Sequence, residues 1–272
     1  MILKPEDILQ QIADAGSWLP LTVARRAFTE HQAIGPALLE AVTNRAATPQ
    51  ERDIPKARLA AFGVFFLAQN RDRKLFEPLV RLFETMDQEV EDEWLFSGRL
   101  FFFGHRLLAG VCPHDPTRPL ELVLNQNLKP LTRAIAVCAI GLLGVYGDVP
   151  RAEAVNVLRS TFKPLRELRD EWTATCWVRT AAKLHVKEFE RELQWFLASG
   201  RLDLDCRRDI ARAMHVHPDA HLVSALALEP MVDLFSNIFP QDIRNGEIGL
   251  LPNGQIPGLE LFQSQEPRPG EN

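Results

Sequence analysis

Apolar residues return along this chain at intervals of three and four, and short polar segments separate the runs. Leu75, Leu79 and Leu82 follow this spacing with charged residues between them, which predicts an amphipathic helix. The preceding run, 59–67, is apolar nearly all round and is therefore expected to be a helix buried on both sides. Because only the polar turn Asn70-Arg71-Asp72 separates the two runs, they should form a helical hairpin.

This hairpin pattern is repeated later in the chain. When Asp72 is aligned with Asp148, apolar positions of Ala60–Phe83 coincide with apolar positions of Ala136–Arg159. The shift is about twice the length of a HEAT-type helical repeat, which is roughly 40 residues. We therefore predict an all-α fold, an α-solenoid or HEAT-like stack of about five helical hairpins.

Further helices are expected on both sides of the repeated pair. Predicted helices begin at Pro5, at Leu19-Pro20 and at Ile34-Gly35-Pro36, and further hairpins run through 94–124 and 172–197. The polar segment Pro49–Pro55 interrupts the pattern. Gly200 is expected to end a helix, and Gly141 and Gly144 fit close packing between helices.

The pattern changes near the C-terminal end of the sequence. After one more apolar stretch, the pairs Asn245-Gly246, Asn253-Gly254 and Pro257-Gly258 are typical of turns. We expect a HEAT-like helical repeat domain over residues 1–217. Residues 218–272 should form an extension, partly helical and then irregular, either as a small hairpin or as a strap on the last repeat. Its last ~10 residues are expected to be disordered.

Composition supports a folded protein and limits its partners. Hydrophobic residues make up 46% of the chain and charged residues 25%, which is enough apolar surface for a substantial core. The formal net charge is −5, so the broad positive field of a nucleic-acid-binding protein is missing. Nucleic acid is therefore an unlikely partner, although a local basic strip stays compatible with the sequence.

The lack of a recognisable targeting signal and the spacing of the cysteines predict a cytoplasmic protein. Met1–Asp7 lacks the features of a secretory signal, and no apolar stretch reaches the about 20 residues that span a bilayer. We expect neither export nor membrane insertion. The cysteines are distributed among the helical repeats, which predicts reduced, mostly buried thiols and no disulfide framework. They are Cys112, Cys138, Cys176 and Cys206.

An acidic segment is the first candidate binding surface. It contains Glu84, Asp87, Glu89, Glu91, Asp92 and Glu93. Crowded carboxylates can have raised pKa values suited to acid–base catalysis, but a solvated helix start explains the segment more simply. A patch for a basic partner is the alternative, and the last four residues of the set are its candidate binding residues. Arg71, Arg73 and Lys74 form either a basic counterpart elsewhere or an ordinary polar turn.

A second candidate group combines acidic, aromatic and basic side chains. Its candidate binding residues are Asp170, Glu171, Trp172 and Arg179, with Trp177, Arg166 and Arg169 nearby. HEAT-like DNA glycosylases use acidic and aromatic residues in a basic groove, so this group makes a nucleic-acid enzyme an alternative. Against it, two tryptophans five residues apart need not share a helix face, and the overall charge is negative.

No metal site, cofactor or catalytic residue is predicted. His215, His217 and His221 lack an identifiable third or fourth ligand, and Pro218 interrupts their helical spacing. Cys112, His114 and Asp115 are better explained as a turn between helices, because prolines flank them. The sequence contains no phosphate-binding glycine loop, nucleophile elbow or zinc-protease motif.

Several short segments, taken in order, carry a family resemblance. They are Leu19-Pro20, Ile34-Gly35-Pro36-Ala37-Leu38-Leu39-Glu40, Leu67-Ala68-Gln69-Asn70-Arg71, Phe76-Glu77-Pro78-Leu79 and Arg106-Leu107-Leu108-Ala109-Gly110-Val111. Over residues 5–215 the chain resembles the bacterial family known as domain of unknown function 1186 (DUF1186). The resemblance implies an all-helical, HEAT-like protein with no assigned activity, so no catalytic residues can be carried over. Many relatives look to end in a cysteine-rich, zinc-binding SEC-C segment, which should be absent here because no cysteine follows Cys206.

These observations lead to a functional prediction. We expect a cytoplasmic bacterial scaffold or adaptor that binds another protein along a curved surface and catalyses no reaction. Two alternatives stay open: an enzyme of the DNA glycosylase type with Asp170 or Glu171 in its chemistry, and a purely structural subunit of an assembly. The identity of the partner and the oligomeric state are not predicted.

Overall fold

The computed structural model of the chain describes residues 4–15, 21–49, 51, 53–85, 100–112, 114–146, 148–167, 170–200, 202 and 206–207. Every regular element in these ranges is a helix, which confirms the predicted all-α class for that part of the chain. The first helices are α1 (Pro5–Asp14), α2 (Leu21–Thr29), α3 (His31–Ala47), α4 (Ile54–Gln69), η1 (Arg73–Leu75) and α5 (Phe76–Thr85). The next are α7 (Leu100–Val111), α8 (Thr117–Leu124), α9 (Pro130–Tyr146) and α10 (Arg151–Ser160). The last are α11 (Phe162–Glu167), α12 (Glu171–His185), η2 (Val186–Phe189) and α13 (Glu190–Ser199).

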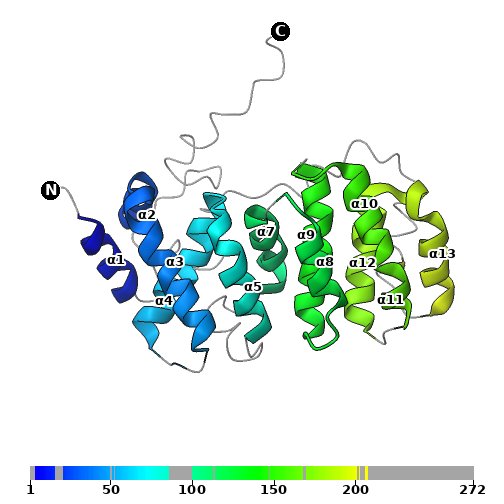
Figure 1. Cartoon of the computed structure of the whole chain (residues 1–272), viewed down its shortest axis with the longest axis horizontal. Helices are drawn as coiled ribbons and strands as arrows, with labels where there is room; N and C mark the ends of the chain where they lie inside the picture. Colours follow the sequence, from blue (N-terminus) through cyan, green and yellow to red (C-terminus); the bar gives the residue numbers. More distant parts are fainter. Residues whose placement is uncertain are drawn as a thin grey trace, which may run out of the picture.

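The helices form an elongated row in chain order, with α1 at one end and α13 at the other (Figure 1). α4 contains the run 59–67, which is predicted to be buried on both sides, and α9 occupies the equivalent place in the second repeated segment. α4 packs against α1, α3 and α7, and α9 packs against α7, α8, α10 and α12. Buried apolar side chains form one core cluster that continues through the row. The two repeated sequence segments become the helix pairs α4–α5 and α9–α10.

Three glycines have the structural roles that the sequence predicts, close helix packing for two of them and the end of a helix for the third. A Cβ atom on Gly141 would lie 2.4 Å from Thr180 Cγ2, and one on Gly144 would lie 2.7 Å from Ala154 Cβ. Both glycines therefore allow helices to approach closely. Gly200 follows α13 with a left-handed φ of 72°, the conformation that ends a helix at little steric cost.

One helix start differs from the prediction. α3 begins at His31, before Ile34, and Pro36 lies inside the helix. The first turn is already closed by the backbone amides of Ala33 and Ile34, which donate to the Glu30 carbonyl at 2.9 and 3.1 Å. Gly35 explains why the proline is tolerated, because it has no Cβ for the proline ring to crowd.

The cysteines agree with the prediction of mostly buried thiols. None of the four forms a disulfide, and Cys112, Cys176 and Cys206 are buried while Cys138 is half-buried. The C-terminal extension predicted over 218–272 lies outside the described residues.

Candidate functional site: a pocket between α3 and α4

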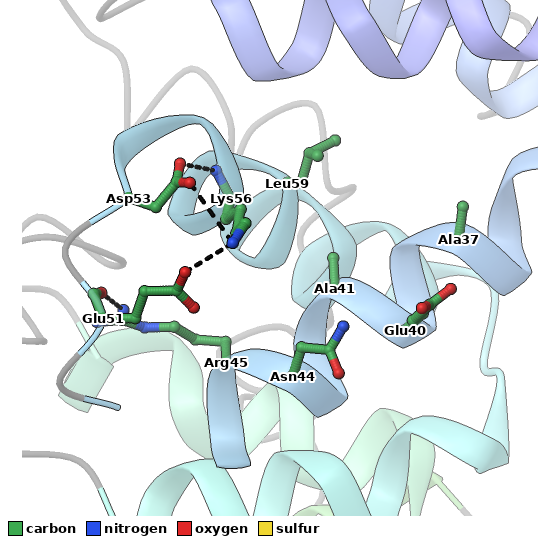
Figure 2. A pocket seen from close by; sticks show the side chains of 9 residues that line it. All are labelled: Ala37, Glu40, Ala41, Asn44, Arg45, Glu51, Asp53, Lys56 and Leu59. Carbon is green, nitrogen blue, oxygen red and sulfur yellow. Dashed lines mark hydrogen bonds and ion pairs between the residues drawn. The ribbon is translucent and has the colours of Figure 1, made fainter. Parts of the chain in front are cut away.

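An open pocket lies between α3 and the first turns of α4. Its volume is about 230 Å³, and side chains from both helices and from the segment that joins them face it (Figure 2). The lining residues are Ala37, Glu40, Ala41, Asn44, Arg45, Glu51, Asp53, Lys56 and Leu59. Apolar atoms line most of the hollow, while charged groups lie around it.

The sequence of α3 explains one wall of the pocket. Glu40 and Asn44 are four residues apart, so they project from the same face of the helix one turn from each other. Leu38 and Val42 project from the opposite face and are fully buried in the core. On the pocket side the small side chain of Ala41 leaves space that a larger residue would occupy.

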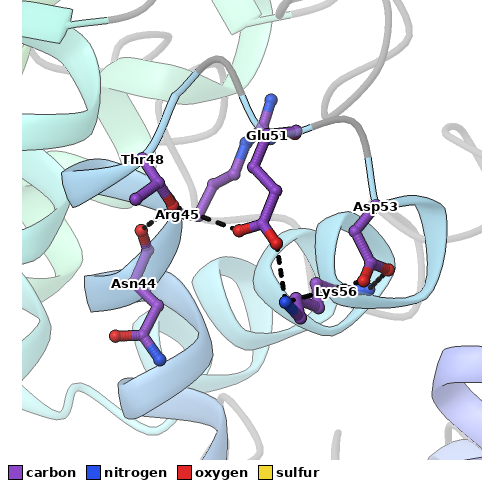
Figure 3. Close-up of polar contacts among 6 residues, drawn as sticks. All are labelled: Asn44, Arg45, Thr48, Glu51, Asp53 and Lys56. Carbon is purple, nitrogen blue, oxygen red and sulfur yellow. Dashed lines mark hydrogen bonds and ion pairs between the residues drawn. The ribbon is translucent and has the colours of Figure 1, made fainter.

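The other wall is organised by the start of α4. Asp53 is the N-cap residue, and its Oδ1 accepts a hydrogen bond from the Lys56 backbone amide at 3.1 Å. Lys56 Nζ lies 2.6 Å from Glu51 Oε1 and 3.6 Å from Asp53 Oδ2 (Figure 3). The hydrogen bond from Lys56 holds the pKa of the Glu51 carboxyl below its usual value, and the same contact raises the pKa of Lys56.

The connecting segment is fixed to the end of α3 by polar contacts. The Arg45 guanidinium donates to the Glu51 backbone carbonyl, and Thr48 Oγ1 donates to the Asn44 backbone carbonyl at 2.8 Å (Figure 3). Thr48 Oγ1 also lies 3.3 Å from Glu51 Oε2. Arg45 and Lys56, the basic side chains among the described residues of the pocket, therefore already form hydrogen bonds or ion pairs within it.

Two polar groups of the pocket are left without such contacts. Within the part of the chain that the structure describes, the Glu40 carboxylate and the Asn44 side-chain amide make no hydrogen bond or ion pair. Glu40 is solvent-exposed, so its charge is available to a ligand. The site combines an apolar floor, a pair of engaged cations and one unengaged carboxylate, an arrangement suited to binding.

None of the predicted site residues that the structure describes lines this pocket. Glu89, Glu91, Asp92 and Glu93 are outside the described residues. Asp170 is buried, with 9% of its surface exposed. Its Oδ1 accepts from the Thr173 backbone amide at 3.0 Å, and its Oδ2 lies 2.8 Å from Arg133 Nη2. Asp170 therefore caps α12 and neutralises a buried arginine.

The neighbours of Asp170 point in different directions. Glu171 and Trp172 are exposed on the first turn of α12, with 50% of Trp172 accessible, and Arg179 is half-buried two turns further along. Trp177 is fully buried, and its Nε1 donates to the Leu158 carbonyl and lies 2.9 Å from Thr161 Oγ1. As expected, the two tryptophans do not share a face.

A second polar cluster lies where three turns meet. Arg71 Nη1 is 3.0 Å from Asp148 Oδ1, Arg73 contacts the His114 ring, and His114 Nδ1 lies 2.8 Å from the Asp148 carbonyl. Burial is the main cause that raises the pKa of the Cys112 thiol to about 12, so this thiol is protonated near neutral pH. No group of three or more metal-ligating side chains occurs in the described residues.

Comparison with known proteins assigns the chain to a family. The family model described as "Protein of unknown function (DUF1186)" matches residues 3–235. The chain belongs to this family. No curated protein and no solved structure matches it. The description of the DUF1186 family names no activity, so membership transfers no site residues to the pocket.

No described helix of this DUF1186 protein is long and apolar enough to cross a membrane.

The pocket between α3 and α4 was not predicted from the sequence. The available sequence signal for the pocket was the pair Glu40 and Asn44, four residues apart on a helix whose same side carries Ala37 and Ala41. Small residues beside spaced polar ones indicate a face that is neither packed in the core nor fully covered by long side chains.

Proposed function

We propose that this DUF1186 protein is a HEAT-like α-solenoid of about five helical hairpins that binds another protein and catalyses no reaction. It would act as a scaffold or adaptor in the bacterial cytoplasm. The row of helices supports this proposal, because stacked hairpins present a long surface to a partner. The proposal includes the division into a repeat domain over 1–217 and an extension over 218–272.

The α3–α4 pocket is the observation that carries the proposal. Its volume of about 230 Å³ is below the 300–1,000 Å³ or so of pockets that enclose small molecules, yet it can receive one side chain of a partner. Its apolar floor and its unengaged Glu40 carboxylate offer both contact area and polarity. A small pocket on a broad surface fits recognition of a protein side chain.

The electrostatics of the pocket also favour binding over catalysis. A general acid or base is most effective when its pKa lies near the working pH. Here the mutual hydrogen bond shifts the pKa of Glu51 down and that of Lys56 up, so both groups stay charged. Such a pair orders the start of α4 and is poorly suited to transferring protons.

Affinity capture with a blocked pocket tests the proposal. The wild-type chain and an Ala41→Phe variant, in which the larger ring fills the hollow, are used to capture proteins from a bacterial lysate. Any protein retained only by the wild type is purified and titrated against both chains by calorimetry. We expect at least a tenfold loss of affinity for Ala41→Phe, and equal binding by both chains would refute a role for this pocket.

The DNA glycosylase alternative has a separate test. Of the two carboxylates that it could use, Asp170 is buried against Arg133, whereas Glu171 is exposed. Titration of a labelled DNA duplex at low salt, where phosphate contacts are strongest, should give no binding. Tight, salt-dependent binding would favour the enzyme and count against the scaffold.

The predicted binding residues remain part of the proposal. Among those that the structure describes, Trp172 is the best placed, because half of its large side chain is accessible. Tryptophan is common at the energetic centres of protein interfaces. If α12 also contacts the partner, Trp172→Ala should weaken the complex by about 1–2 kcal/mol, and the same calorimetry measures it.

A further inference from the structure

We propose that the α3–α4 pocket receives a lysine or arginine side chain of the partner protein, with Glu40 as the residue that recognises its charge. This inference rests on the proposed function and adds the chemical class of the group that is bound. Four features support it: the charge balance, the engagement of the resident cations, the apolar floor and the position of Asn44.

The described residues that line the pocket carry a net negative charge. They include three carboxylates, on Glu40, Glu51 and Asp53, and two cations, on Arg45 and Lys56. Lys56 lies within ion-pair distance of both Glu51 and Asp53, so the third carboxylate is the one without a partner among the described residues. A ligand that carries one positive charge would neutralise the site.

An anionic ligand fits the pocket poorly. The two groups that would attract it, Arg45 and Lys56, already donate to oxygen atoms of Glu51. Binding an anion would require breaking these contacts and would place its charge near three carboxylates. The pocket therefore favours a cation.

The apolar floor matches the stem of a basic side chain. Ala37, Ala41 and Leu59 line the hollow beside the charged groups. Lysine and arginine carry three or four methylene groups before their charge, and they commonly lay this stem along apolar surface. The pocket can thus cover the stem while Glu40 contacts the charged end.

Asn44 supplies a second acceptor. It follows Glu40 by one helical turn, and its side-chain amide has no hydrogen-bond partner among the described residues. Its carbonyl oxygen can accept a hydrogen bond from an ammonium or guanidinium group that a carboxylate already holds. Two acceptors one turn apart suit a group with several N–H donors.

Selection of peptides from a random library tests the proposal without knowledge of the natural partner. A phage-displayed library of 12-residue peptides is panned on the full-length wild-type chain, with removal of peptides that bind the Glu40→Lys variant. Enriched peptides are synthesised, and their affinities for each variant are measured by fluorescence anisotropy. Glu167→Lys is the matched control, because it makes the same charge change at an exposed residue of α11.

The expected result has three parts. Enriched peptides should share a lysine or arginine at one position, and replacing it by methionine should weaken binding at least tenfold. Glu40→Lys should abolish binding and Glu40→Gln should weaken it about tenfold, the scale of one charged contact. Glu167→Lys should leave the affinity within twofold of wild type.

Two outcomes would overturn the inference, and they differ in what they say about the proposed function. Enriched peptides that lack a basic residue, or that ignore Glu40→Gln, would refute the ligand class while leaving protein binding intact. Failure to enrich any peptide on the wild-type chain would count against both. Circular dichroism of each variant confirms that the helices are retained.

Discussion

Asp53 and Asp170 perform the same local task in two very different regions. Asp53 precedes α4 and Asp170 precedes α12, and each accepts a hydrogen bond from the backbone amide three residues later, at 3.1 Å for Asp53 and 3.0 Å for Asp170. The second oxygen of Asp53 faces Lys56 at the open pocket, whereas that of Asp170 lies 2.8 Å from the buried Arg133. Helix capping is thus common to both, and the surroundings decide whether nearby charge is available to a ligand.

The largest expected effect distinguishes these two aspartates by their contribution to stability. Asp170→Ala leaves Arg133 buried without its counter-ion, and such a loss typically costs about 3–5 kcal/mol. Asp53→Ala removes a cap at the surface and should cost only about 1 kcal/mol. Urea unfolding followed by circular dichroism measures both changes in the free energy of unfolding.

A double substitution shows whether the difference arises from burial of charge. Replacing Arg133 by Met and Asp170 by Leu together removes both charges, so the double variant should be markedly more stable than Asp170→Ala. Equal losses for Asp53→Ala and Asp170→Ala would contradict the comparison, because they would show that capping alone accounts for both residues.

A smaller effect is expected from enlarging the side chain at Gly141 of α9 and at Ala41 of α3. Gly141→Ala would bring a Cβ to 2.4 Å from Thr180 Cγ2 and should cost about 1–3 kcal/mol, less the gain in helix propensity of up to about 1 kcal/mol. Ala41→Leu adds atoms into the pocket and should change stability by under about 0.5 kcal/mol. Thermal unfolding compares the two variants.

The matched control for Gly141 is its neighbour. Thr180→Ser removes the Cγ2 atom while keeping the hydroxyl that donates to Cys138 Sγ. It should restore much of the stability lost in Gly141→Ala. If Ala41→Leu is as costly as Gly141→Ala, then the α3 face is packed more tightly than the pocket implies.

The smallest expected effect concerns Glu51 and its dependence on pH. Its pKa in the folded state lies below the ordinary 4.5, so its contribution to stability is present above that pH. It is lost as the pH falls through the lower, folded-state pKa. Wild type should therefore be slightly more stable than Glu51→Gln at pH 7, with the two converging in acid. Urea midpoints at several pH values test this, and a difference that grows in acid would contradict the assigned contact.

The sequence predicted the helices well because their information is local. The spacing of Leu75, Leu79 and Leu82, and the apolar run of α4, were sufficient to identify a buried helix and its covering partner. The α3 start was placed a few residues late, because Pro36 looked like a first-turn residue and Gly35 made an interior proline possible.

The candidate site was harder to predict because it depends on contacts between distant residues. Asp170 had the residue type of a functional carboxylate, but nothing adjacent to it in the chain reveals that Arg133 lies against it. In the same way, Glu40 looked like an ordinary exposed helix residue until α4 defined the opposite wall of the pocket.

The contact between Arg71 and Asp148 has a mechanical consequence. It joins the turn after α4 to the turn after α9, and so bypasses the α7–α8 hairpin that lies between them in the chain. Core packing already joins neighbouring hairpins along the row, and this contact adds a polar link at one edge. Because Arg71 is half-exposed, the link contributes only about 0–1 kcal/mol and is weakened by salt. The resistance of this edge of the row to bending should therefore fall slightly as the ionic strength rises.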